Sequence, residues 1–173
     1  MSPSEIGTAH HLFLQFCDFD RCTTPEGRQS ELERLRDKRI LSREQADVIS
    51  LEQIGQFFDS PLFAQMRSSS ELRREFKFSV LVPAAEYFEE AQELPDEEVL
   101  LQGVVDCLFD TPEGLVIVDF KTDRVRDGWE HRRAEQYRPQ LEAYRRAVRE
   151  VFGRPVAGCR LYFLQTGRTV ELR

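Results

Sequence analysis

Three charged residues in the second half of the sequence have the types and spacing expected of a site that holds a divalent metal ion. Asp106 follows one short apolar run, Asp119 ends the next, and Lys121 stands two positions beyond Asp119. Side chains of a strand alternate between its faces, so Asp119 and Lys121 share one face and Phe120 takes the other. The turn-forming residues 110–114 allow the two runs to pair as an antiparallel hairpin, which brings Asp106 beside Asp119. Two carboxylates with a neighbouring ammonium predict a metal site in which the lysine handles water.

The ordinary alternative is an exposed charge pair, since an Asp-x-Lys sequence at the end of a strand usually has no further role. The context of Asp119 argues against it. Residues 115–118 form a continuous apolar run, which is typical of a strand buried on both faces. Burying a carboxylate at the end of such a strand costs several kcal/mol unless a cation or partner compensates. A bound metal ion would remove that cost.

The elements before this hairpin are mainly helical. Ser42 and Gln45 form a capping-box pair, Thr8 lies near the cap of the first helix, and Pro61 suits the first turn of a short one. From apolar residues at helical spacing, we expect helices over residues 6–19, 31–41, 42–58 and 61–66.

Strands dominate the rest of the chain. A long helical pattern over 129–152 stops at Gly153, and its Pro139 either kinks the helix or marks its true beginning. We expect strands over residues 72–83, 99–109, 115–121, 159–164 and 169–172. The order predicts an α/β (α+β) fold with a central mixed sheet flanked by helices. It forms one domain of residues 1–173, in which a helical portion, 1–70, precedes a sheet core, 71–173.

Composition fits a globular protein of one domain. At 173 residues with 40% hydrophobic and 32% charged residues, the chain can bury a core without disulfide bonds. It has no apolar run of membrane-spanning length, and the first residues lack the features of a signal peptide, so we expect a cytoplasmic location and no membrane contact. The four cysteines lack the paired spacing of a zinc site, and we interpret them as reduced thiols.

The net charge of −7 is unfavourable for binding DNA, but the charge is unevenly distributed. Residues 124–160 contain ten arginines against five acids, whereas residues 86–98 contain seven acids and no base. The second segment is predicted to be a flexible loop, because like charges repel. A basic helix near the metal site could contact phosphates, or its arginines could form a solvated face.

The hairpin and four further segments together resemble the PD-(D/E)XK nucleases, specifically the RecB-like nuclease domain that ends AddA-type helicase-nuclease subunits. The resemblance covers nearly the whole chain. Its segments, in the order of the family, are GTAHH at 7–11, the helical stretch at 41–66, REFKF at 74–78, GVVD and IVDFKTD within 103–123, and the Q-x-x-x-Y of Gln140 to Tyr144. It implies a restriction-endonuclease-like core.

The resemblance also implies roles for residues of the metal site. Asp106, Asp119 and the backbone carbonyl of Phe120 would hold Mg²⁺, which prefers oxygen ligands, and Lys121 would hold or deprotonate the attacking water. The motif histidine falls at His11. By itself a histidine there is more often structural or exposed, but the resemblance implies that His11 belongs to the metal site. Nitrogen suits Mn²⁺ better than Mg²⁺, so if His11 binds the ion, we expect manganese to support activity at least as well as magnesium.

Three further residues have both a functional and an ordinary interpretation. Glu75 would complete the metal shell or orient a ligand, or would be a strand-surface charge. Gln140 and Tyr144 lie one helical turn apart and could reach the hairpin or the DNA backbone, although Tyr144 could equally pack in the core. Tyr137 is expected to pack.

The function implied is a metal-dependent DNA nuclease that cuts single strands during processing of double-strand breaks. The chain has no phosphate-binding loop of an ATPase, so it cannot itself hydrolyse ATP by that route. The resemblance implies a helicase motor upstream and an AddB-like partner. Two alternatives stay open: a noncatalytic nucleic-acid-binding or scaffolding domain that keeps the fold, and a free-standing RecB-like nuclease such as a CRISPR-associated one.

Overall fold

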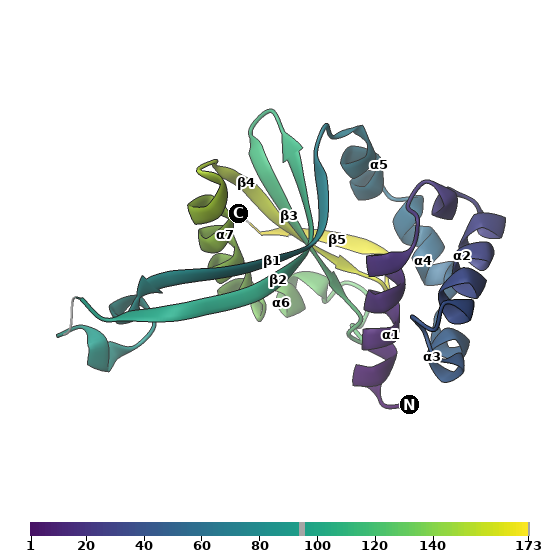
Figure 1. Cartoon of the computed structure of the whole chain (residues 1–173), viewed down its shortest axis with the longest axis horizontal. Helices are drawn as coiled ribbons and strands as arrows, with labels where there is room; N and C mark the ends of the chain where they lie inside the picture. Colours follow the sequence, from purple (N-terminus) through teal and green to yellow (C-terminus); the bar gives the residue numbers. More distant parts are fainter. Residues whose placement is uncertain (94–95, 173) are drawn as a thin grey trace.

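The computed structural model describes residues 1–93 and 96–172, and within them five strands form one mixed sheet in the order β1-β2-β3-β4-β5 (Figure 1). β3 and β4 are parallel, and the other neighbours are antiparallel. The strands are β1 (Leu72–Pro83), β2 (Glu98–Thr111), β3 (Gly114–Lys121), β4 (Val156–Phe163) and β5 (Arg168–Leu172). The predicted mixed sheet is therefore confirmed, with each strand close to its expected bounds.

Helices precede the sheet and also cover it, as predicted. The first part of the chain contains α1 (Pro3–Phe16), α2 (Pro25–Asp37), α3 (Arg43–Val48), α4 (Leu51–Phe58) and α5 (Pro61–Ser68). Between β3 and β4 lie α6 (Glu130–Glu135) and α7 (Arg138–Phe152). Short 3₁₀ turns occur at Arg21–Thr23, Ala84–Glu86 and Glu89–Ala91.

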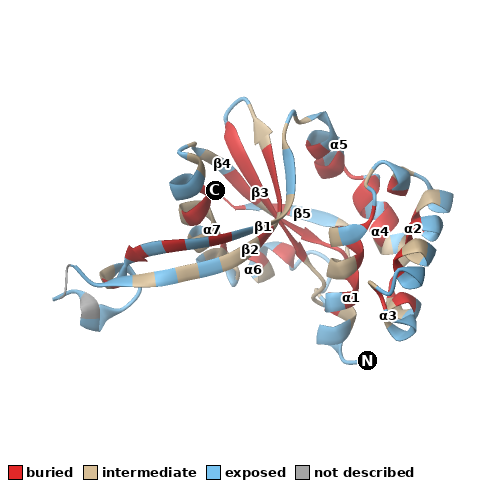
Figure 2. Cartoon of the chain, viewed as in Figure 1, coloured by how far each residue is buried: buried red, intermediate tan, exposed pale blue. Residues whose placement is uncertain are grey.

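β3 is buried on both faces because helices cover the sheet from both sides (Figure 2). Every second residue of β3, ending with Phe120, packs in a core built from α1, α2, α4 and α5. The residues between them, such as Ile117, pack in a second core with α6 and α7. Since side chains alternate along a strand, Asp119 and Lys121 lie on the side of α7.

β1 and β2 continue past the rest of the sheet as a two-stranded arm (Figure 1). They pair from Leu72 opposite Phe109 to Pro83 opposite Glu98, whereas β3 pairs with β2 only as far as Cys107 opposite Val118. β2 thus leaves β3 directly after Cys107. The next residue toward the arm is Asp106.

Two of the predicted helices are divided in the structure. The capping box of Ser42 and Gln45 is confirmed, but the helix expected over 42–58 is wrong, because the chain breaks at Ile49 and Ser50. Ser50 caps α4, and its N–H donates to Nε2 of His10, 3.1 Å away. The long helix expected over 129–152 ends at Glu135 and resumes at Arg138.

Pro139 lies in the first turn of α7, so it marks the true beginning of that helix rather than a kink. The predicted stop is confirmed as well. Gly153 adopts φ 60°, the left-handed conformation that glycine accepts most easily at a helix end.

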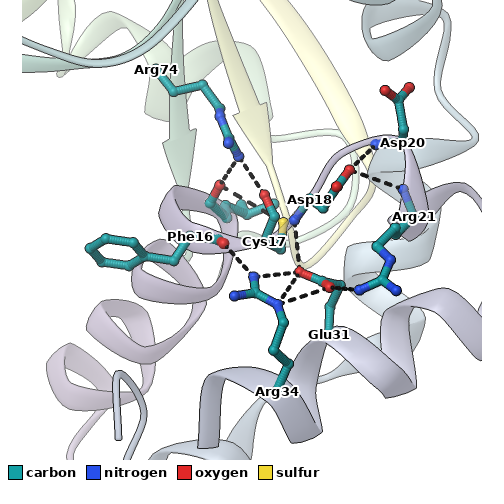
Figure 3. Close-up of polar contacts among 9 residues, drawn as sticks. Phe16, Cys17, Asp18, Asp20, Arg21, Glu31, Arg34 and Arg74 are labelled. Carbon is teal, nitrogen blue, oxygen red and sulfur yellow. Dashed lines mark hydrogen bonds and ion pairs between the residues drawn. The ribbon is translucent and has the colours of Figure 1, made fainter. Parts of the chain in front are cut away.

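A buried carboxylate ties the C-terminal end of α1 to α2 (Figure 3). Glu31 is fully buried and accepts hydrogen bonds from Arg34, from the Asp18 N–H at 2.8 Å and from Arg21 at 3.1 Å. Burial alone would raise the pKa of Glu31, but these donors lower it to about 2. Arg34 also donates to the Phe16 carbonyl at 2.8 Å, which fixes the end of the helix that carries His11.

β1 holds the same end of α1. Arg74 donates to the carbonyls of Leu14 and Cys17 at 3.1 and 2.7 Å, and its guanidinium lies 4.3 Å from the ring centroid of Phe19. All four cysteines are buried and unpaired, in agreement with reduced thiols.

No helix within residues 1–93 and 96–172 is long and apolar enough to cross a membrane. The acidic segment 86–98, predicted to be a flexible loop, includes short 3₁₀ turns, and its residues 94 and 95 lie outside the described residues.

Candidate active site

The predicted acidic pair lies where β2 and β3 separate. Asp106 and Asp119 directly follow the last ladder pair, Cys107 and Val118, so they face each other where the strands no longer pair. Oδ2 of Asp106 accepts the Phe120 N–H at 2.7 Å. Because the N–H and C=O of a strand residue point to the same side, the Phe120 carbonyl also faces β2.

Asp119 is buried beside Lys121. The side chain of Asp119 is 6% exposed and that of Lys121 is 12% exposed, and Asp119 Oδ2 lies 2.7 Å from Lys121 Nζ. Burial and the charge of Asp106 raise the pKa of Asp119 to about 6, although Lys121 opposes the shift. The predicted shared face of Asp119 and Lys121 is therefore confirmed.

His11 approaches the other aspartate from α1. Its Nδ1 lies 3.4 Å from Asp106 Oδ1. Burial would lower the pKa of His11, but the hydrogen bond and charge of Asp106 raise it. The neighbouring His10 is structural, because its two ring nitrogens contact the Ile6 carbonyl and the Ser50 N–H.

Gln140 and Tyr144 reach the hairpin from α7. Lys121 Nζ donates to Gln140 Oε1 at 3.0 Å, and Gln140 Nε2 contacts the Tyr144 hydroxyl at 2.9 Å. Burial and then the charge of Asp119 raise the pKa of Tyr144 to about 12. Tyr144 also packs edge-on against Phe78 with ring centroids 5.6 Å apart, so it packs in the core, and its functional interpretation stays a prediction.

Glu75 lies across from Asp106 in the β1–β2 register, between the pairs formed by Arg74 and Phe76. It adopts φ 52°, a left-handed conformation that costs a non-glycine residue roughly 1 kcal/mol or more. Partial burial and the charge of Asp106 raise the pKa of its carboxyl. Glu75, His11 and Asp106 line a common open hollow of about 430 Å³.

Tyr137 contributes a contact that the sequence analysis missed. Lys121 Nζ lies 3.8 Å from the centroid of its ring, a cation–π arrangement. The Tyr137 hydroxyl donates to Asp123, and Arg133 donates to the same carboxylate at 2.9 Å. The one signal in the sequence was the position of Tyr137 three residues before Gln140, which puts both on one side of the α7 start.

The donor set suits a hard divalent cation. In the part of the chain that the structure describes, Asp119 Oδ2 is a buried carboxylate oxygen whose ion-pair partner is the Lys121 ammonium, 2.7 Å away. No cluster of three His, Cys, Asp or Glu side chains among these residues encloses an ion by itself. His11 instead pairs with Asp106, and Asp119 with Lys121. The ligand set of His11, Asp106, Asp119 and the Phe120 carbonyl stays a prediction.

The arginines of α7 lie mostly away from this site. Arg145, Arg146 and Arg149 line an open hollow of about 810 Å³ together with Glu86, Glu142 and Glu150, and Arg146 pairs with Glu86. Their charge is largely balanced there. This part of the basic segment fits the interpretation as a solvated face better than that of a phosphate contact.

Comparison with known proteins identifies the family of the chain. Residues 1–172 match the model of the PD-(D/E)XK nuclease superfamily. The chain is 36% identical over 172 residues to an ATP-dependent helicase/nuclease subunit of Desulforamulus reducens and 36% identical over 167 residues to its counterpart in Desulforudis audaxviator. It is 33% identical over 179 residues to the counterpart in Bacillus velezensis.

These alignments cover 96–99% of the chain but 14% of each relative, so the chain spans about one seventh of their length. The family model, in contrast, matches nearly every residue. The chain belongs to the PD-(D/E)XK nuclease superfamily, and it matches the nuclease region of AddA-type helicase/nuclease subunits.

Proposed function

We propose that the chain is a Mg²⁺- or Mn²⁺-dependent deoxyribonuclease, acting as one domain, that hydrolyses phosphodiester bonds of single DNA strands. The observation that carries the proposal is the meeting of Asp106, Asp119 and Lys121 where β2 and β3 separate, with His11 against Asp106. Lys121 offsets only part of the cost of burying the Asp119 carboxylate beside Asp106, and a bound cation would compensate for the rest.

The residues that would hold the ion are Asp106, Asp119 and the Phe120 carbonyl, with His11 as a nitrogen ligand that favours manganese. When bound, such an ion lowers the pKa of water and neutralises charge on the scissile phosphate. Glu75 faces the same hollow and would orient a water molecule or a ligand.

Lys121 would hold the attacking water and offset charge on the phosphate. Asp119, Gln140 and the ring of Tyr137 surround its ammonium, so little freedom is left to the side chain. Fixing a catalytic group in this way lowers the entropy that is lost on reaching the transition state. In this scheme Gln140 and Tyr144 act by positioning Lys121.

The matched relatives are named ATP-dependent helicase/nuclease subunits. We therefore place this nuclease in a longer cytoplasmic protein whose motor feeds it single strands during the processing of double-strand breaks, together with an AddB-like partner. A weak intrinsic affinity for DNA, expected from the net charge of −7, would suffice if the motor delivers the strand.

Cleavage of end-labelled single-stranded and duplex DNA by the purified chain tests the proposal. Asp119→Ala and Lys121→Ala should each lower the rate on single strands by at least about 100-fold. The exposed residues Asp47 and Lys77 offer matched controls, and their alanine variants should cleave like the wild type.

A second measurement separates a dead site from a misfolded one. Millimolar Mn²⁺ should raise the Tm of the wild type, because a ligand that binds only the folded state stabilises it, and should not raise that of Asp119→Ala. Full cleavage by Asp119→Ala would overturn the proposal. A wild type that binds no Mn²⁺ and cuts nothing would favour a noncatalytic domain instead.

A further inference from the structure

An exposed tryptophan stands among arginines beside α6. Trp129, the only tryptophan of the chain, is 47% exposed. It lines a shallow hollow of about 320 Å³ with Arg124, Arg126, Arg132 and Arg133. A large aromatic side chain left in water costs free energy that a ligand stacking on it would recover.

Most of the charge of this hollow is not compensated, although Arg133 pairs with Asp123. No acidic residue lines it, and within the described ranges Arg124, Arg126 and Arg132 form no ion pair with a carboxylate. The guanidinium carbon of Arg132 lies over the Trp129 ring, 5.0 Å from its centroid, a cation–π contact that holds a positive charge against one face of the indole. The larger hollow on α7 differs, because glutamates there stand among the arginines.

Hollows that share residues lead from Trp129 to the acidic site. The Trp129 hollow and the neighbouring one of about 930 Å³ share Arg124. That neighbour shares Ser4 and Thr122 with the hollow that contains Asp106. A second connection passes through Arg133, which contacts both Asp123 and Tyr137 beneath Lys121.

We propose that the Trp129 hollow is a binding platform for single-stranded nucleic acid, in which the indole stacks on a base while Arg124, Arg126 and Arg132 contact phosphates. The inference rests on the proposed nuclease function and adds the surface that grips the strand beside the site. A single strand fits better than a duplex, because only unpaired bases expose a face for stacking. Unbalanced cations around one aromatic ring also favour a polyanion over a protein partner.

Because Trp129 is the only tryptophan, its fluorescence reports on the platform directly. We expect saturable quenching when the full chain is titrated with a thymidine oligonucleotide in EDTA, and little change with a blunt duplex of equal length. Unchanged fluorescence of the wild type at saturating oligonucleotide would overturn the platform.

Variants separate stacking from charge. Measured with a labelled oligonucleotide, Trp129→Ala should weaken binding about 5- to 100-fold, and Trp129→Phe should restore most of it. Arg126→Ala should lower the slope of log affinity against log salt by about 0.7, the value for one phosphate contact on a single strand. Phe88→Ala and Arg149→Ala, which alter an exposed aromatic side chain and an α7 arginine elsewhere, are the matched controls.

One further variant distinguishes this inference from the nuclease proposal. Asp119→Ala should abolish cleavage yet keep the quenching of Trp129. If Trp129→Ala binds the oligonucleotide as tightly as the wild type while Asp119→Ala is inactive, the platform is wrong and the nuclease stands. Quenching by a wild type that never cleaves DNA would keep the platform and refute the nuclease.

Discussion

Asp119 has the least favourable surroundings of the acids at the site, and this has a measurable consequence without metal. Its pKa rises from 3.8 to about 6, so the folded state holds a proton more tightly than the unfolded state does. Stability therefore falls as the pH rises through that window, and at pH 7 the ionised carboxylate destabilises the fold. Asp119→Asn should therefore raise Tm in EDTA more at pH 7 than at pH 5, because the gain comes from removing the ionised carboxylate.

Asp110 is a control, because its pKa is shifted in the opposite direction from that of Asp119. Ser69, Ser70 and the Glu71 N–H donate to its carboxylate and lower its pKa to about 2. Stability from Asp110 is present above the unfolded pKa of 3.8 and is lost as the pH falls toward 2. Asp110→Asn should therefore lower Tm at pH 7. If Asp119→Asn and Asp110→Asn change Tm at pH 7 in the same direction, the electrostatic explanation is wrong.

Glu75 provides a second test at the scale of a residue. In an ordinary strand glycine is less stable than alanine, but at φ 52° the order should reverse. We expect Glu75→Gly to unfold at a denaturant concentration that corresponds to about 1 kcal/mol more stability than Glu75→Ala. Lys77, an exposed position on the same strand, should show the usual order with alanine ahead. An alanine advantage at both positions would show that Glu75 is not strained.

Single residues were predictable from the sequence where alternation along a strand decides their placement. Asp119 and Lys121 share a face as expected, and the hairpin brings Asp106 opposite. The strain of Glu75 and the ring of Tyr137 under Lys121 were not predictable. Both depend on how separate elements meet, which local periodicity does not encode.

At the scale of elements, α1 must lie close to the loop after β3 for His11 to reach Asp106. A β-carbon on Gly7 would lie 2.6 Å from Thr122 Oγ1, closer than contact allows. Gly7→Ala should therefore displace α1 or Thr122 and shift His11, one turn further on. We expect cleavage to fall about 10-fold, because small misplacements near reacting groups are costly.

Removing the obstructing hydroxyl should reverse the effect of Gly7→Ala on stability. In a Thr122→Ala background the remaining contact is 3.6 Å, an ordinary distance, and alanine is a better helix former than glycine by about 1 kcal/mol. The Tm of the double variant should therefore be higher than the Tm of Thr122→Ala alone. If Gly7→Ala destabilises both backgrounds equally, the close approach of α1 to Thr122 is not the reason.

The predicted element boundaries were right where a local sequence signal sets the boundary, and wrong where a contact with a distant residue sets it. The capping box at Ser42 and the stop at Gly153 are local, and both are confirmed. The break between α3 and α4 is supported by the bond from the Ser50 N–H to His10, forty residues away along the chain. The apolar residues keep a helical spacing across that break, so the pattern alone did not predict it.

At the scale of the whole molecule, the order of elements predicts a mixed sheet flanked by helices, because apolar runs alternate with helical patterns in a way that only a layered fold satisfies. The sequence could not predict that β2 leaves β3 at Asp106 to form an arm with β1. Both strands look continuous in the sequence, and their separation depends on long-range pairing.

This division of the sheet predicts a gradient of stability across the molecule. β3 has a neighbouring strand on each side and is buried in two cores, whereas the far part of the arm exposes Leu81 and Leu100, which face each other in the β1–β2 register. Amide hydrogen exchange of Val116–Phe120 should require global unfolding. Amides around Leu81 and Leu100 should exchange by local opening, at least about 100-fold faster.

Leu161 in the buried β4 is the internal reference and should exchange as slowly as β3. Asp106 connects the arm to β3, because it is the first residue of the arm and its side chain still accepts a hydrogen bond from the Phe120 N–H. Added Mn²⁺ should therefore slow exchange near Asp106 more than at Leu81 or Val116, because the ion would tie the mobile strand to the rigid one. Equal exchange rates in the arm and in β3 would show instead that the sheet opens as a single unit.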